Sequence, residues 1–173
     1  MEIRFHPESK QPALARAAAE YRRLWEAHGD DVIEKLAAAT GLRFPEPALD
    51  AVVFEGMSQS HPLRLRASYD NETKLATLIH ELAHRLVHGH ARPSVASDQP
   101  SQERQNHELI DLFLFDVWAD LYGEAFAKRQ VEIESERRPM YRDAWHVALA
   151  IDPASRAAKL RGLLSASTRP GSP

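Results

Sequence analysis

The residues of this chain that are best suited to chemistry are histidines clustered near its middle. Two of them enclose a glutamate in the pattern His-Glu-x-x-His over residues 80–84. On an α-helix, residues four apart lie about 6 Å apart along the axis and about 40° apart around it, so His80 and His84 can bind one metal ion. Glu81 lies about 100° further round the helix, close enough to contact a metal-bound water without being a ligand. This spacing predicts a carboxylate base beside a metal ion.

The absence of cysteine limits both the metal ligands and the chemistry. With no cysteine in the sequence, disulfide scaffolds, cysteine-type zinc fingers, thiol nucleophiles and iron–sulfur clusters are excluded. Any metal ion must be held by histidine, aspartate or glutamate. Two imidazoles at this spacing predict Zn²⁺ as the cofactor.

A catalytic zinc ion requires a third protein ligand and an open position for water, and a second helix is the place to look for that ligand. Residues 109–122 are apolar nearly all round, which predicts a buried helix. Asp116 and Asp120 share one face of it, and buried carboxylates are costly unless they are paired, hydrogen-bonded or bound to a metal ion. The pair therefore requires a positive partner.

Together these features resemble the gluzincin arrangement of the zincin-like metallopeptidases, including the small intracellular minigluzincins. The resemblance covers about residues 50–128 and rests on residues 80–84 followed by Asp-Val-Trp-Ala-Asp-Leu-Tyr-Gly at 116–123. It implies that Asp116 is the third zinc ligand and that Asp120 orients a ligating imidazole. Gluzincins carry glutamate at the ligand position, so an aspartate requires the two helices to approach about 1 Å closer.

Other residues compete for the roles that the resemblance assigns. His90 lies ten residues after His80, a spacing used by metzincins, and Glu108 is a further candidate third ligand. His88 fits poorly, because it lies about 12 Å from His80 along the helix. Transition-state stabilisation needs a donor to the developing oxyanion. The candidates for that donor are Tyr69, Tyr122, Tyr141 and His146.

Periodicity and turn residues predict the elements that position these groups. We expect a helix over 12–28 that is interrupted at Gly29, and a second one that ends at Gly41. Two short strands are expected at 51–54 and 63–69, the second a possible edge for an extended peptide substrate. The further expected elements are a helix over 72–88, a polar loop over 90–102, a helix over 105–128, a charged stretch over 132–138, a helix over 141–150 and a short helix after Pro153.

The chain therefore reads as an α+β protein: a mostly helical, zincin-like single domain with a small sheet. We expect this domain to span residues 1–167 and a disordered tail to span 168–173. The sequence of 173 residues carries 22 basic and 25 acidic side chains, a formal charge of −3, which argues against nucleic acid as a partner. No apolar run is long enough to span a membrane and no secretory signal is visible, which indicates a cytoplasmic protein.

The function expected from these features is that of a zinc-dependent metallopeptidase acting on an intracellular protein or peptide. His80, His84 and Asp116 would bind the zinc ion, and Glu81 would transfer the proton. Two alternatives stay open: a catalytically inactive, zinc-stabilised binding or regulatory module, and a metal-free helical interaction protein.

Overall fold

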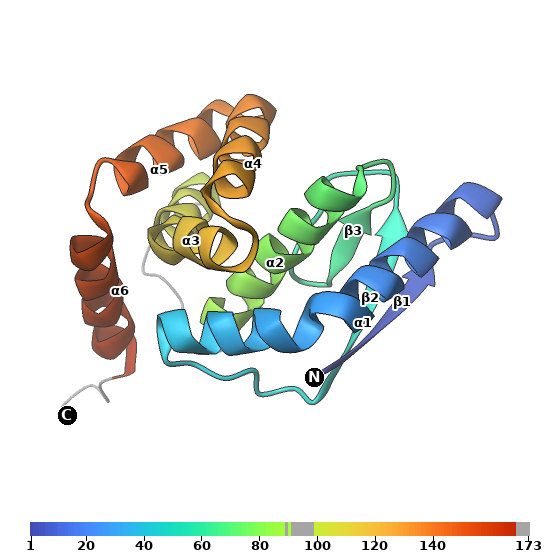
Figure 1. The fold of residues 1–173 in the computed structure, drawn as a ribbon, viewed down its shortest axis with the longest axis horizontal. Coiled ribbons are helices and arrows are strands. Elements are labelled where there is room, and N and C mark those ends of the chain that lie inside the picture. Colours follow the sequence, from blue (N-terminus) through green and yellow to red (C-terminus); the bar gives the residue numbers. More distant parts are fainter. Residues whose placement is uncertain (89, 91–98, 169–173) are drawn as a thin grey trace. The chain divides into compact units, whose positions relative to one another are not determined.

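The computed structural model describes residues 1–88, 90 and 99–168, and in this part of the chain the protein is mostly helical with one small sheet (Figure 1). The expected α+β class is confirmed. Along the chain the elements are β1 (Glu2–Pro7), α1 (Pro12–Thr40), β2 (Ala48–Phe54), β3 (Arg64–Arg66), α2 (Asn71–His88), α3 (Gln99–Tyr122), α4 (Glu124–Arg137), α5 (Pro139–Leu149) and α6 (Pro153–Thr168). They divide into two compact units, Met1–Glu34 with Arg43–Leu86, and Lys35–Leu42 with the described residues of Val87–Pro173. The extent of the domain expected from the sequence stays a prediction.

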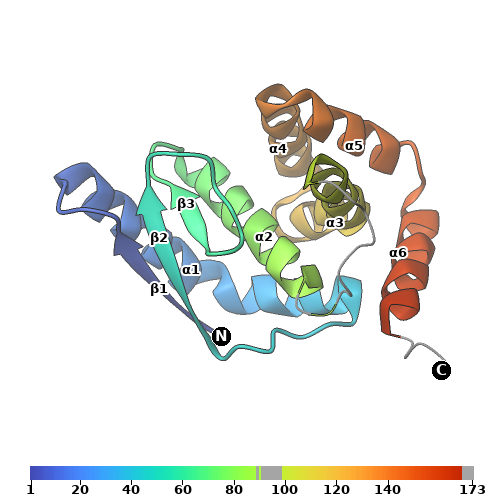
Figure 2. The same cartoon turned by 180° about the vertical axis from the view of Figure 1, so that it is seen from behind.

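The sheet of the first unit is parallel, with the strand order β1-β2-β3. Ile3 pairs with Leu49 and Val53 pairs with Leu65, and all four side chains are buried. The two views of the ribbon show α1 and α2 on the same face of the sheet (Figures 1 and 2). The small sheet was expected, but β1 was not, because its short alternation of apolar and charged residues gives only a weak signal.

Charged side chains occupy the strand positions that point away from this core. Asp50 on β2 contacts two side chains of β1, with His6 Nε2 and Arg4 Nη2 each 2.9 Å from its carboxylate. The hydrogen bond to His6, followed by the charges of Arg4 and His6, lowers the pKa of Asp50 below its usual range. All three side chains are more than half exposed, so this face of the sheet is in contact with solvent.

Helix α1 is continuous from Pro12 to Thr40, so the break expected at Gly29 is wrong. Gly29 has a packing role: a Cβ atom there would lie 2.8 Å from the ring of Trp25, one turn earlier. The glycine therefore makes room for the indole within a regular helix. At the end of the helix the hydroxyl of Thr40 donates to the carbonyl of Leu36, and Gly41 follows with a positive φ of 72°.

Helix α2, which carries the His-Glu-x-x-His pattern, matches the expected element closely and begins with a side-chain cap. The Oδ1 atom of Asp70 accepts a hydrogen bond of 2.8 Å from the backbone N–H of Thr73. This bond satisfies one of the N–H groups that lack a partner within the first turn of a helix.

Removal of this cap gives a first testable prediction. Asp70→Ala should lower the free energy of unfolding by about 1 kcal/mol, because the Thr73 N–H loses its acceptor. Urea denaturation followed by circular dichroism measures the loss. Asp70→Ser is the matched control, since serine can accept the same bond, and an equal loss in both variants would contradict the capping role.

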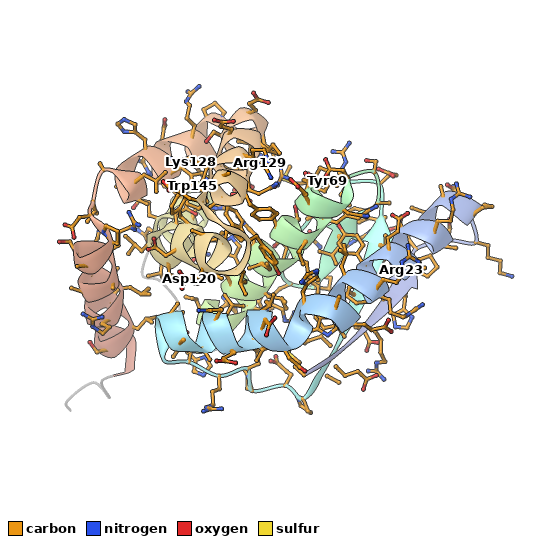
Figure 3. The ribbon with its side chains drawn as sticks, viewed as in Figure 1. Arg23, Tyr69, Asp120, Lys128, Arg129 and Trp145 are labelled. Carbon is orange, nitrogen blue, oxygen red and sulfur yellow. The ribbon has the colours of Figure 1, made fainter. Side chains whose placement is uncertain are left out.

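In the second unit, the helix expected over 105–128 is two helices. Helix α3 begins earlier than expected, at Gln99, and α4 begins at Glu124; the intervening Gly123 has φ +87°, a conformation that L side chains rarely adopt. The rings of Trp118 and Trp145 lie 5.6 Å apart in the core of this unit, and Trp145 comes from α5 (Figure 3). The charged stretch over 132–138 lies mostly within α4, where the buried Glu134 accepts a hydrogen bond of 3.0 Å from the indole N–H of Trp145.

Two expectations fall wholly or partly on residues outside the described part of the chain. Residues 91–98 of the expected polar loop are among them, and residues 99–102 belong to α3. Most of the expected disordered tail, residues 169–173, is also outside the described part. None of the helices that the structure describes has an apolar stretch that could span a lipid bilayer.

Candidate metal centre

His80 and His84 lie on neighbouring turns of α2 and point their imidazole rings at each other, as their spacing predicts. Their Nε2 atoms are 3.1 Å apart, and the ring centroids are 4.8 Å apart in an edge-on arrangement. His80 is 5% exposed and His84 is partly buried. Glu81, which follows His80, is only 7% exposed.

The separation of the two nitrogens fits a shared metal ion. Two imidazole nitrogens bound about 2.0–2.1 Å from a tetrahedral zinc ion lie about 3.3 Å from each other. The observed 3.1 Å is close to this value, so little rearrangement of either ring is needed. Without a metal ion, one of the two nitrogens must carry a proton and donate it to the other.

A third histidine completes a group that can hold a metal ion. His107 on α3 is 5% exposed, and one ligand atom from each of His80, His84 and His107 lies within 4.8 Å of the others. Three neutral imidazoles are a suitable ligand set for zinc and for several other divalent metals. His107 was not among the ligands expected from the sequence. The signal that was missed is its position at the start of the apolar part of α3.

Helix geometry separates His107 from the aspartates expected to serve the metal ion. Asp116 lies nine residues after His107, which places it about 180° round the helix. Its two carboxylate oxygens accept hydrogen bonds of 2.6 Å and 3.2 Å from Arg156 of α6. Asp120, which is largely exposed (Figure 3), lies 3.4 Å from Lys35. Arg156 and Lys35 are therefore the positive partners that the two aspartates were expected to require. The metal-related roles of Asp116 and Asp120 stay predictions.

The Arg156–Asp116 pair gives a prediction for stability. Arg156 is 4% exposed, so Arg156→Met should lower the free energy of unfolding by about 1–3 kcal/mol by removing two charge-assisted hydrogen bonds to a half-buried carboxylate. Chemical denaturation measures the change. Lys128→Met is the matched control, because Lys128 forms an exposed ion pair with Glu124 that contributes little to stability. Equal effects of the two substitutions would contradict the assigned role of Arg156.

The remaining candidate ligands have other surroundings. Glu108, also on α3, pairs with Arg104 at 2.9 Å. The backbone N–H of His90 donates to the carbonyl of Val87 just after α2 ends. Within the described residues, the three-histidine group contains neither of these side chains. His88 is exposed at the last position of α2.

Among the candidate oxyanion donors, Tyr141 contacts a member of the group with its ring. Its ring centroid lies 4.2 Å from that of His107, with the planes tilted by 39°. Tyr122 packs against Phe126 at 4.9 Å, and Tyr69 lies beside the guanidinium of Arg66. The role of oxyanion donor stays a prediction for these three tyrosines and for His146.

The residue that follows the second histidine of α2 ties this helix to two loops of the first unit. Arg85 Nη1 donates a hydrogen bond of 2.8 Å to the carbonyl of Ser60, and its Nη2 lies 3.4 Å from Glu46. Its side chain is 14% exposed. These contacts explain why a mostly buried helix carries an arginine at this position.

Comparisons with known proteins add no relative to this description. No protein-family model matches the chain, and no curated protein and no solved structure matches it significantly. The site itself must therefore carry any conclusion about function.

Proposed function

We propose that this chain is a zinc-dependent hydrolase of peptide bonds, with His80, His84 and His107 as the metal ligands and Glu81 as the catalytic base. The observation that carries the proposal is the group of three imidazoles with their ligand atoms within 4.8 Å of one another. Three protein ligands leave a fourth position for water, which is the arrangement of catalytic zinc sites. A zinc ion with four protein ligands would instead be structural.

The proposal keeps the zincin-like resemblance and changes its third ligand. Gluzincins place an acidic ligand on the second helix, with Asp or Asn four residues later. On α3 the same spacing joins His107 to Asp111, which is 1% exposed and lies about 40° from His107 around the helix. Histidine ligands usually donate their second N–H to a carboxylate or carbonyl, so Asp111 is proposed to orient His107. The role expected of Asp120 thus passes to Asp111.

Glu81 is proposed to move the proton. Bound zinc supplies Lewis acidity, which activates water and polarises the scissile carbonyl. Glu81 would accept the proton of the attacking water and donate it to the amine that leaves. Glu81 is buried, so its carboxylate lies in surroundings less polar than water. Its attraction to a bound zinc ion would be stronger there than in water.

A protein or peptide is the proposed substrate, in the cytoplasm. The sequence suggested the strand that ends near Tyr69 as an edge to which an extended polypeptide could add. The strand β3 does lie at one end of the sheet, in the same unit as His80, His84 and Glu81. Its outward backbone groups already have partners, because Arg64 exchanges two hydrogen bonds with Gln59, and Arg66 bonds Ser58 and Tyr21. A peptide could therefore add to β3 only by displacing these partners.

The test combines metal analysis with a search for hydrolysis. Untagged protein should contain one equivalent of zinc by plasma mass spectrometry, and it should cleave members of a defined peptide library, with products identified by mass spectrometry. Chelation of the metal should stop cleavage, and added zinc should restore it. Protein without zinc would favour the metal-free interaction protein. Zinc-loaded protein that cleaves no peptide would favour the zinc-stabilised binding module.

A further inference from the structure

The imidazole of His107 is packed against an aromatic side chain from another helix of the same unit. The ring of Tyr141 on α5 lies over it, 4.2 Å away between centroids. Aromatic contacts of this kind are worth about 0.5–1.5 kcal/mol beyond the burial of their area. Such a contact restricts rotation of the imidazole about its terminal side-chain bond, and this rotation decides where the two ring nitrogens point.

An ion pair one turn earlier holds the start of α5 against the same face of α3. Arg138, the residue before Pro139, contacts Glu103 at 3.1 Å. Glu103 precedes His107 by four residues, so the two lie about 40° apart around α3. The contacts Glu103–Arg138 and His107–Tyr141 therefore follow one another along the two helices.

From these contacts we infer that Tyr141 is a positioning residue for the metal site and that it acts through its ring and not through its hydroxyl. This inference rests on the proposed function, because it assumes that His107 is a ligand. The ring limits the orientations of the imidazole before metal binds, so less conformational freedom is lost when the ligand set assembles. A hydroxyl that acts on the substrate would have no such effect on metal affinity.

Two substitutions at Tyr141 separate the ring from the hydroxyl. Tyr141→Phe keeps the ring and should bind zinc as the unaltered protein does. Tyr141→Leu removes the ring contact and should raise the dissociation constant for zinc about 3–10-fold, because the metal must then immobilise an imidazole that the ring no longer holds. Competition with a chromogenic chelator measures the affinity, and the visible spectrum of the Co²⁺-loaded protein reports on ligand geometry independently of activity.

The matched control is Phe126→Leu, which removes a ring contact of the same kind, to Tyr122, in the same unit. It should leave zinc affinity and the Co²⁺ spectrum unchanged. Should Tyr141→Leu fail to fold, Glu103→Gln takes its place, because it weakens the attachment of α5 next to His107 and should also lower the affinity.

Each other outcome counts against the inference. If Tyr141→Leu binds zinc as tightly as the unaltered protein, Tyr141 has no positioning role. If Tyr141→Phe and Tyr141→Leu lose the same zinc affinity, the effect belongs to the hydroxyl. A loss in Phe126→Leu as large as that in Tyr141→Leu indicates general destabilisation. If the unaltered protein itself takes up no metal in the same titration, the proposed function fails as well, and the two failures are thereby distinguished.

Discussion

Replacing His107 by alanine is expected to remove the metal ion from the purified protein. The affinity for zinc should fall by more than about 100-fold, because the residues that only orient ligands are themselves worth about 10–100-fold. Two imidazoles would remain, and they cannot hold a catalytic zinc ion that normally has three protein ligands. Zinc content by plasma mass spectrometry and affinity by chelator competition measure this change.

Asp116→Asn is the matched comparison for that experiment. It changes one side chain on the opposite face of the same helix, where the carboxylate pairs with Arg156. Zinc content should stay at one equivalent, while the free energy of unfolding falls because the ion pair is lost. The reverse pattern, in which Asp116→Asn loses zinc and His107→Ala keeps it, would restore the acidic third ligand expected from the sequence.

Glu81→Gln should abolish hydrolysis and leave zinc bound. Glutamine has nearly the same shape as glutamate but cannot accept and return a proton, and general acid–base catalysis contributes about 10²–10⁴-fold to a rate. We therefore expect turnover of a cleavable library peptide to fall by at least about 100-fold. The zinc content and unfolding midpoint should change little, since Glu81 is not a ligand in this scheme.

The companion variant for this experiment is Glu72→Gln in the first turn of the same helix, an exposed position. It makes the same chemical change far from the histidines and should retain full turnover. Retained activity in Glu81→Gln would remove the base assignment, and loss of zinc in that variant would indicate that Glu81 coordinates the metal itself.

The parts of the fold that follow from local pattern were predicted well. Helix α2 was expected to within a residue, because Asp70 caps its start and Gly89 follows its end. The failures have specific physical causes. Gly29 was predicted to end a helix, but α1 continues through it, and the lack of a side chain there leaves space for the ring of Trp25. Gly123 carries little local signal, yet its backbone conformation ends α3.

The site was predictable to the extent that its chemistry is local. His80 and His84 are four residues apart, so helix geometry alone brings their rings together. His107 is 23 residues beyond His84, and nothing in periodicity says which side chain of a later helix completes a ligand set. The same limit applies to Asp116, whose partner Arg156 lies 40 residues further along the chain. A carboxylate in a buried helix indicates a cation, but it does not say which cation.

The positive φ at Gly123 has a stereochemical consequence. Only an achiral residue, or one of the D configuration, adopts this backbone geometry without strain, although the space around its α-carbon is open. The turn at Gly123 starts α4, and α5, which follows α4, packs along α3 and carries the aromatic ring beside His107. An L side chain at position 123 would therefore strain a turn on which this aromatic contact depends, although there is room for the side chain itself.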